Sequence, residues 1–229
     1  MAGAAPPKRR PAEVVYGRRP VAEARRGRRR VRRVWTSSDL PAPELTRLAG
    51  SPDHQGIVAE VDPFPYADPR ELLERPDGLL VALDQVQDPR NLGAVCRSAE
   101  AAGADGVVIP SRRAAAVTAV ACKASAGAVE HLPVARVPNL ADWLATAKEA
   151  GAWVYGGEAG AATPHDRADL TGKVVLVLGS EGGGLRRRVA AGCDLLISVP
   201  VRGRVASLNV AAAAAVLLFE AARQRAASP

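Results

Sequence analysis

Two loops in the C-terminal third of the chain combine glycines, a carboxylate and an amide, residue types suited to a ligand site. An apolar run, Val174–Leu178, ends in loop 179–184, which contains four glycines and Glu181. A second apolar run, Leu195–Val199, ends at a proline and leads to the Ser-Leu-Asn segment 207–209. Ligands of open α/β sheets bind at the carboxyl ends of strands, so these loops are predicted to converge in one site.

The glycine loop differs from the known phosphate-binding loops. Its glycines let backbone amides approach a ligand closely. It lacks the Gly-Lys-Ser/Thr ending of a P-loop. No GxGxxG fingerprint follows the first strand of the larger unit, which argues against a nicotinamide dehydrogenase. Glu181 either serves the site or is an acid favoured at a helix N-terminus by the helix dipole.

A further candidate segment is Asn91-x-Gly93-x-x-x-Arg97. On a helix, Gly93 and Arg97 are one turn apart and share a face. Asn91 starts this helix, where its side chain either caps the helix or points into a site. Arg97 is either functional or a surface arginine of an amphipathic helix. Arg202 and Arg204, after the second strand, either bind phosphate or lie in a solvated loop.

Alternating strands and helices must position these residues. Apolar runs predict strands at 79–83, 106–109, 132–137, 153–155, 174–178 and 195–199. Helices are predicted at 91–102, 114–124 and 139–150, with a last helix capped by Ser207 and running to Arg223. This alternation predicts an α/β fold with a mostly parallel sheet and helices on both faces.

Composition divides the chain into four parts. Residues 1–13 show no periodicity and are predicted to be a disordered basic tail. Residues 14–62 are predicted to form a small α/β module near the lower limit of independent stability. The proline-rich segment 63–76 is predicted to be a linker, and 77–229 the larger unit.

The amino-acid content limits the class of protein. Hydrophobic residues make up 48% of the chain and aromatic residues 3%, so a sizeable core must be mostly aliphatic. The three cysteines lack CxxC spacing and the three histidines lack ligand spacing, so we expect no disulfides and no metal. Without a secretory signal or an apolar run of membrane-spanning length, a cytoplasmic protein is expected.

The charge is uneven along the chain. The whole chain has a net charge of +7, whereas residues 1–33 hold 12 Lys and Arg against two acids. Such a basic segment points to a polyanion partner, although a solubilising tail has the same composition.

Together, the three candidate segments resemble the signature motifs of the SpoU/TrmH class of RNA ribose 2'-O-methyltransferases, in the SPOUT superfamily. The matching segments are 91–99, 176–185 and 197–211, in the order and at the separation found in the family. Residues 123–134 also resemble the family's middle segment. One motif alone is weak, but three in register are specific, and the resemblance covers residues 77–225.

The resemblance implies a fold and a cofactor that periodicity cannot give. The parallel sheet would end in a C-terminal trefoil knot, a rare feature in proteins. S-adenosyl-L-methionine would bind in the knot of a homodimer. The residues implied for the cofactor site are Gly179, Val199, Leu208, Ser207, Leu178 and Ile197.

The resemblance also assigns catalytic roles. Arg97 would act at the ribose hydroxyl, and Asn91 and Asn209 would orient Arg97 and the nucleotide. Glu181 would fix either the glycine loop or Arg97. Active sites of the family form at the dimer interface, so Arg97 could serve the cofactor of the other subunit.

The chemistry explains why such residues are needed. A ribose hydroxyl is a poor nucleophile at neutral pH, whereas a sulfonium is already a good methyl donor and needs no metal. Catalysis therefore requires in-line placement and removal of the hydroxyl proton. A guanidinium is an awkward base because its pKa is very high. Arg97 is therefore expected either to remove the proton or to hold the adjacent phosphate while phosphate or water removes it.

The N-terminal part resembles the family's small substrate-binding domain through residues 15–24 and 54–59, here in a shortened form. These residues suggest the branch of the family that methylates guanosine in 23S rRNA. RNA contacts are expected at Arg18, Arg19, Arg28, Arg29, Arg202 and Arg204. Alternatives are a tRNA methyltransferase, a ribosome-modifying enzyme that confers antibiotic resistance, and a catalytically silent RNA-binding protein. The presence of all four catalytic-motif residues argues against the silent protein.

Overall fold

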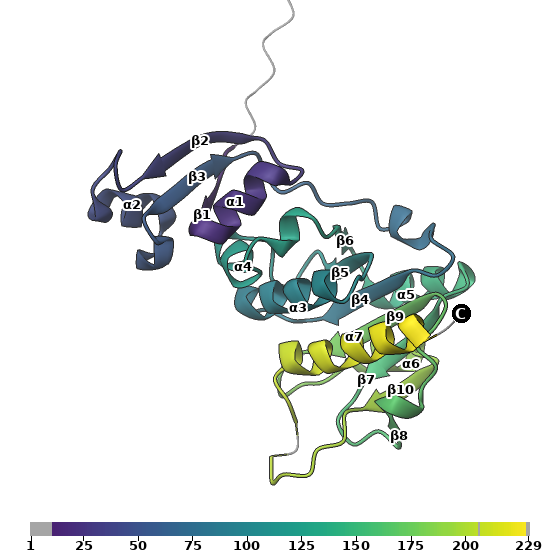
Figure 1. Cartoon of the computed structure of the whole chain (residues 1–229). Helices are drawn as coiled ribbons and strands as arrows, with labels where there is room; N and C mark the ends of the chain where they lie inside the picture. Colours follow the sequence, from purple (N-terminus) through teal and green to yellow (C-terminus); the bar gives the residue numbers. More distant parts are fainter. Residues whose placement is uncertain (1–10, 206, 228–229) are drawn as a thin grey trace, which may run out of the picture.

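The computed structural model describes residues 11–205 and 207–227, which form two β-sheets (Figure 1). The N-terminal sheet is antiparallel, with strand order β1-β3-β2. Its elements are β1 (Glu13–Tyr16), α1 (Arg18–Arg26), β2 (Val31–Thr36), α2 (Ala42–Ala49), the 3-10 helix η1 (Pro52–His54) and β3 (Ile57–Val61). The disordered tail was predicted at residues 1–13, but β1 already begins at Glu13. Residues 1–10 lie outside the described chain.

The second sheet has seven strands within the described residues, all paired in parallel, in the order β6-β5-β4-β9-β7-β10-β8. This confirms the predicted mostly parallel α/β fold. Its elements are η2 (Glu71–Leu73), β4 (Leu79–Asp84), α3 (Pro89–Ala101), β5 (Gly106–Pro110), α4 (Ala119–Ala124), η3 (Ala128–Glu130), β6 (Val134–Val137), α5 (Leu140–Glu149), β7 (Trp153–Gly157), β8 (Thr163–Pro164), η4 (His165–Arg167), β9 (Val174–Gly179), α6 (Arg187–Gly192), β10 (Leu195–Ser198) and α7 (Val210–Ala227).

The sheet is covered on both faces, as its continuous apolar strands require. Except in the short edge strand β8, alternate residues of the strands point into two separate cores, one on each face. Helices α3 and α7 pack against each other on one face, and α5 and α6 pack together on the other (Figure 1). The carboxyl ends of the strands therefore meet at one edge, between two helical layers.

Two predicted helices start later than expected. Helix α4 begins at Ala119 rather than at residue 114, because residues 111–118 form a loop in which the amide of Ala115 donates to the carbonyl of Val86 at 2.8 Å. The side chain of Thr118 then caps α4. The last helix begins at Val210, so Ser207 is not its N-cap.

The N-terminal module does not stand apart from the larger unit. Val15, Val21 and Val61 belong to the same buried cluster as the residues of α3 and α7. The predicted linker 63–76 is packed rather than free, because its three large apolar side chains, Phe64, Leu72 and Leu73, are buried. The module is therefore held on the larger unit by one continuous core.

None of the helices in residues 11–205 and 207–227 is long and apolar enough to cross a membrane. Within the same ranges, no group of three or more His, Cys, Asp or Glu residues is placed to hold a metal ion.

Candidate functional site

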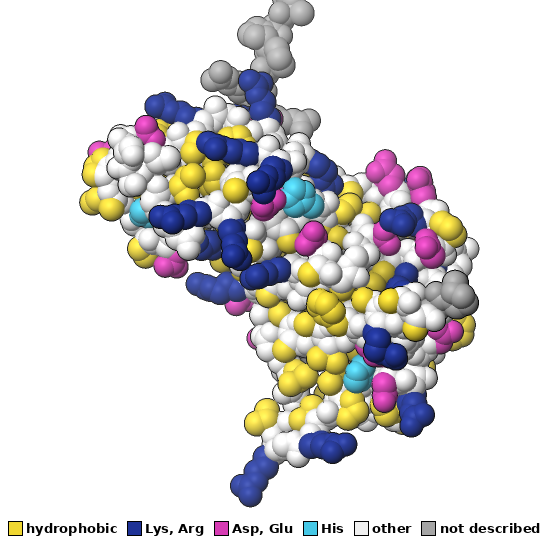
Figure 2. Space-filling view, in the orientation of Figure 1, with side chains coloured by type: hydrophobic (Ala, Val, Ile, Leu, Met, Phe, Trp, Pro, Cys, Tyr) yellow, Lys and Arg dark blue, Asp and Glu magenta, His cyan; other side chains and the backbone are white. Residues whose placement is uncertain are grey.

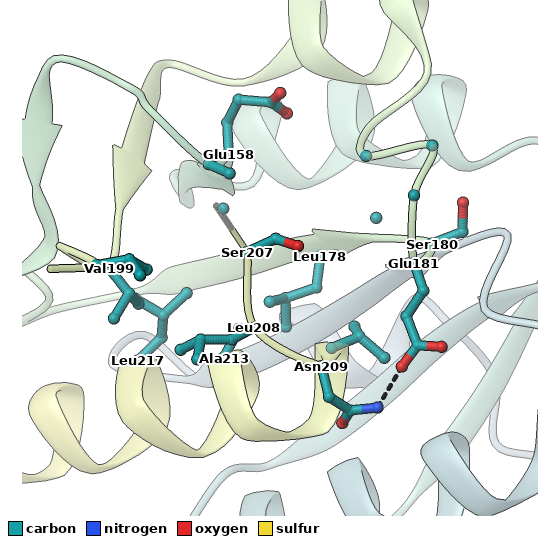
Figure 3. Close-up of a pocket in the computed structure, with 18 of the residues that line it drawn as sticks. Glu158, Leu178, Ser180, Glu181, Val199, Ser207, Leu208, Asn209, Ala213 and Leu217 are labelled. Carbon is teal, nitrogen blue, oxygen red and sulfur yellow. Dashed lines mark hydrogen bonds between the residues drawn. The ribbon is translucent and has the colours of Figure 1, made fainter. Parts of the chain in front are cut away.

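A cavity of about 550 Å³ opens at the carboxyl ends of β7, β9 and β10 (Figure 3). This volume is in the range of small-molecule sites. Its walls include loop 179–184, segment 207–210, the strand ends at 157–159 and 197–201, and Ala213 and Leu217 of α7. The two loops singled out in the sequence therefore do converge. All six residues predicted for the cofactor line this cavity: Gly179, Val199, Leu208, Ser207, Leu178 and Ile197.

The glycine loop folds tightly on itself. A Cβ atom on Gly179 would lie 2.1 Å from the backbone carbon of Gly184, which no side chain can satisfy. The amide of Gly184 donates to the carbonyl of Ser180 at 3.0 Å, and Gly182 and Gly184 both have positive φ. Glycine is therefore needed here for the shape of the loop as well as for close approach to a ligand.

The charge of the cavity restricts its ligand. Glu158 and Glu181 are the only ionisable side chains among its described lining residues. Carboxylates repel phosphate groups, so the cavity suits a neutral or cationic ligand with apolar surface. Glu158 was missed in the sequence, although it directly follows the strand at 153–157 and thus lies at the carboxyl edge.

Asn91, Glu181 and Asn209 form one hydrogen-bonded cluster at the side of the cavity. The side-chain amide of Asn209 donates to Oε1 of Glu181 (Figure 3) and to Oδ1 of Asn91, the latter at 3.1 Å. The amide of Asn91 donates to the same Oε1 atom at 3.1 Å. Glu181 thereby joins α3, the glycine loop and the start of α7.

The two asparagines have different local roles. Asn209 is the cap of α7, since its Oδ1 accepts the amide of Ala211 at 2.9 Å. This explains an asparagine at that position, because asparagine is among the preferred N-cap residues. Asn91 is not a cap, since Asp88 accepts the amide of Arg90 and caps α3. Its side chain is free to point into the cluster.

Arg97 does not join this cluster within the described chain. Its side chain is exposed on α3 and makes no hydrogen bond or ion pair with the residues that the structure describes. Gly93 lies in the core instead, where an added Cβ would approach the carbonyl of Ala121 to 2.4 Å. Gly93 and Arg97 do lie one turn apart on α3, but α4 packs against α3 at Gly93, whereas Arg97 is exposed to solvent.

The arginines that were expected to bind RNA differ in their exposure and in their hydrogen bonds. Arg18, Arg19, Arg202 and Arg204 are exposed, and Arg28 is exposed over part of its surface. Arg28 donates to the backbone carbonyl of Leu132 at 2.9 Å and to that of Glu130 at 3.4 Å, and burial lowers its pKa. This guanidinium is therefore already engaged with the protein backbone.

The structure contradicts the expectation that Arg29 contacts RNA. Its side chain is 1% exposed and forms an ion pair with Glu130, which is also 1% exposed. Its Nε donates to Glu130 at 3.0 Å, Nη1 to Glu13 at 3.1 Å and Nη2 to the sulfur of Cys122. Burial alone would lower the pKa of Arg29, but the hydrogen bonds and charges of Glu130 and Cys122 together outweigh burial and raise that pKa.

Comparison with known families places the chain. The model of the SpoU rRNA Methylase family matches residues 78–219, and the chain belongs to this family. An uncharacterised tRNA/rRNA methyltransferase of Mycobacterium avium is 42% identical over 96% of this chain and 82% of its own length. A Synechocystis protein of the same description is 39% identical over 93% of this chain, which spans 63% of that relative's length.

Several solved structures resemble about two thirds or more of the chain. The SpoU methyltransferase AviRb from Streptomyces viridochromogenes, in complex with S-adenosylmethionine, has a TM-score of 0.78 and 31% identity over 94% of this chain and 91% of its own. An S-adenosylmethionine-bound rRNA methyltransferase from Sinorhizobium meliloti has a TM-score of 0.81 and 26% identity, covering 93% and 87% of the two chains. A structure concerning 2-OH methylation of C/U34 on tRNA has a TM-score of 0.59 and 27% identity, covering 66% and 97%.

Proposed function

We propose that the protein transfers a methyl group from S-adenosyl-L-methionine to a ribose 2'-hydroxyl of RNA, with a guanosine of 23S rRNA as the first-choice target. The observation that carries the proposal is the cavity between the two loops. Its apolar walls suit an adenosine, its backbone groups suit the edges of the base, and its carboxylates suit a cationic sulfonium. Two similar solved proteins bind this cofactor.

In this proposal the residues of the chain position the reactants. S-adenosyl-L-methionine supplies an activated methyl group when it is bound. Glu181 accepts hydrogen bonds from Asn91 and Asn209 and so holds both cavity loops against α3. Arg97 binds the phosphate next to the target ribose, which favours loss of the hydroxyl proton to phosphate or water.

Labelled methyl transfer tests the proposal. The protein is incubated with methyl-labelled S-adenosyl-L-methionine and, separately, 23S rRNA, 16S rRNA and tRNA. We expect label in 23S rRNA, at a ribose whose 3' phosphodiester resists alkaline hydrolysis. Label on a base would reject ribose chemistry, and transfer to tRNA alone would favour the tRNA enzyme. RNA binding without any transfer would favour the silent RNA-binding protein.

We also propose a homodimer formed through α7. Residues 210–219 of this helix are all apolar, which is typical of a helix segment buried on all sides, and its charged residues follow from Glu220 onward. Its inner face is in the core, whereas Val216 and Phe219 are exposed. Hydrophobic side chains gather on the surface where Figure 1 places α7 (Figure 2). A partner subunit that covers this stripe would also lie next to Arg97, since α3 and α7 are neighbours.

Phe219→Glu is expected to convert the dimer to a monomer, because it places a charge in an apolar interface. The measurement is molar mass by light scattering during size-exclusion chromatography. Trp153→Glu is the matched control, since Trp153 and Phe219 are 53% and 52% exposed. The control should stay dimeric. A dimeric Phe219→Glu protein would show that α7 is not the interface.

The proposal includes the domain roles and the knot. Residues 14–62 bind the substrate, and residues 77–229 form the methyltransferase domain with a trefoil knot in its C-terminal part. The knot is proposed because the chain belongs to the SpoU rRNA Methylase family. An RNA-modifying role places the protein in the cytoplasm.

The RNA surface that we propose begins at Arg18 and Arg19 and ends at Arg202 and Arg204 beside the cavity. Replacing these four arginines by glutamine should weaken binding to 23S rRNA and reduce the slope of log K against log salt. The expected reduction is about 0.7–0.9 for each phosphate group that the variant no longer binds. Filter binding at several salt concentrations measures it.

The matched control for these four arginines is a set of other exposed arginines outside the surface: Arg47, Arg70, Arg136 and Arg167. Their replacement removes the same total charge and should leave the slope closer to that of the unmodified protein. Equal effects of the two sets would show that only total charge matters.

A further inference from the structure

Asp84 is a fully buried acid whose carboxylate is held, among the described residues, by Arg186 alone. It ends β4 and is 0% exposed. Its Oδ2 accepts the backbone amide of Arg186 at 2.9 Å. Its Oδ1 accepts Nε of Arg186 at 2.8 Å and pairs with Nη2 at 2.7 Å. One arginine therefore binds both carboxylate oxygens, through its backbone and its side chain.

The position of this pair gives it a specific consequence. In the pairing of β4 with β9, Asp84 lies opposite Gly179, the first residue of the glycine loop. Arg186 closely follows the loop and precedes α6. Both ends of the loop are therefore fixed at Asp84, one by strand pairing and the other by the carboxylate.

The pair also connects the loop to the asparagine of α3. The chain runs from Asp84 through a short polar segment into α3, which carries Asn91. Glu181, inside the glycine loop, accepts a hydrogen bond from Asn91. A loop that opened at Arg186 would move Glu181 away from this asparagine and would deform the wall of the cavity.

We propose that Asp84 and Arg186 are positioning residues that hold the glycine loop in the shape that binds the methyl donor. This inference rests on the proposed cofactor. Burying an ion pair is a poor way to gain stability, because desolvation offsets most of the attraction. Its value here lies in geometry, since a planar guanidinium held by a carboxylate fixes direction as well as distance.

Asp84→Asn tests the inference, with Asp105→Asn as the matched control. Asp105 also accepts a strand amide, that of Leu79 at 2.8 Å, and also pairs with an arginine, Arg75, but it lies at the amino edge of the sheet. Asp84→Asn should raise the calorimetric dissociation constant of S-adenosyl-L-methionine about tenfold or more, because charged hydrogen bonds are lost. Asp105→Asn should change it less than about twofold.

Amide hydrogen exchange of the protein without cofactor gives a second, independent measurement. In Asp84→Asn, the peptide covering residues 179–186 should exchange about tenfold faster, because local opening of the loop becomes easier. The same peptide should be unaffected in Asp105→Asn. Arg186→Lys keeps the charge but loses the planar fork. It should show the same two effects even where Asp84→Asn fails to fold, since the Arg186 side chain is 46% exposed.

The outcomes separate this inference from the proposed function. If the unmodified protein does not bind S-adenosyl-L-methionine, the proposed function fails, while loop exchange still decides whether the pair holds the loop. If the unmodified protein binds but Arg186→Lys leaves both affinity and loop exchange unchanged, the positioning role is rejected. A lower melting temperature with unchanged affinity and exchange would mean that the pair only stabilises the fold, which also overturns the inference.

Discussion

Arg97→Ala is expected to lower the rate of methyl transfer by about 10³-fold while changing the dissociation constant of S-adenosyl-L-methionine by less than about tenfold. The reason is that Arg97 lies outside the cavity and is not among its described lining residues. It is therefore placed to act on the RNA rather than on the methyl donor. Single-turnover transfer to 23S rRNA and calorimetric titration of the cofactor measure the two quantities.

Arg90→Ala is the control for Arg97→Ala. Arg90 is also exposed on α3, two helical turns before Arg97 on the same outward face, and its loss removes the same charge. Its replacement should leave the single-turnover rate within about threefold, because it is assigned no role at the reacting centre. A near-normal rate of methyl transfer in Arg97→Ala would reject the catalytic role of Arg97. Equal losses of rate in Arg97→Ala and Arg90→Ala would show that only the loss of a positive charge matters.

Mixing variants tests whether Arg97 acts across the proposed dimer. Arg97→Ala and Asn209→Ala subunits are combined, dissociated and allowed to pair at random. If Arg97 serves the partner's cavity, mixed dimers contain one intact composite site, and activity should recover to about a quarter of normal. If Arg97 serves its own subunit, no site in a mixed dimer is intact and activity stays low.

The two loops that line the cavity could be predicted because their signal is local. Glycine is required at position 179 because the backbone of Gly184 lies too close for a Cβ atom, and the positive φ of Gly182 and Gly184 favours glycine there. The shape of the loop therefore produces a recognisable run of glycines in the sequence. The same holds for the strands of the parallel sheet, whose residues are buried on both faces and read as continuous apolar runs. The starts of α4 and α7 were predicted less accurately, since the capping side chains are Thr118 and Asn209.

The features that could not be predicted from the sequence depend on contacts between segments that are distant in the chain. Arg29 lies in a run of arginines, and nothing in the sequence distinguishes it from Arg28 or Arg30. Its burial arises because the N-terminal module packs on η3, which presents Glu130 more than a hundred residues later in the chain. Glu158 was missed for a similar reason, since the sheet order that brings β7 beside β9 is not visible in the sequence.

Glu130→Ala is expected to lower the free energy of unfolding by about 3–5 kcal/mol, since it leaves a buried guanidinium without its main partner. Arg29 cannot avoid this cost by losing its proton, because a guanidinium remains charged at any accessible pH. Glu13 offers only partial compensation, as its side chain is 42% exposed and binds a different nitrogen of Arg29. Urea denaturation measures the change.

Glu23→Ala is the control for Glu130→Ala. Glu23 also joins the N-terminal module to the residues near η3, through His131 at 2.8 Å, but this pair is solvent-exposed. Its loss should cost less than about 1 kcal/mol. The double replacement Arg29→Met and Glu130→Leu should recover most of the stability lost in Glu130→Ala, because an apolar pair removes the desolvation cost. A loss below about 1 kcal/mol in Glu130→Ala would mean that the pair is open in solution.

The Arg29–Glu130 pair also decides whether the N-terminal module can act as a fixed RNA-binding platform. A module on a free linker could bind RNA at variable distances from the cavity, whereas a module joined by a buried ion pair and a shared core sets one distance. Glu130→Ala should therefore weaken RNA binding at a temperature where the protein remains folded, while the affinity for S-adenosyl-L-methionine is unchanged. If both affinities fall together, the pair supports the whole fold. If neither falls, the module does not depend on this pair for its placement.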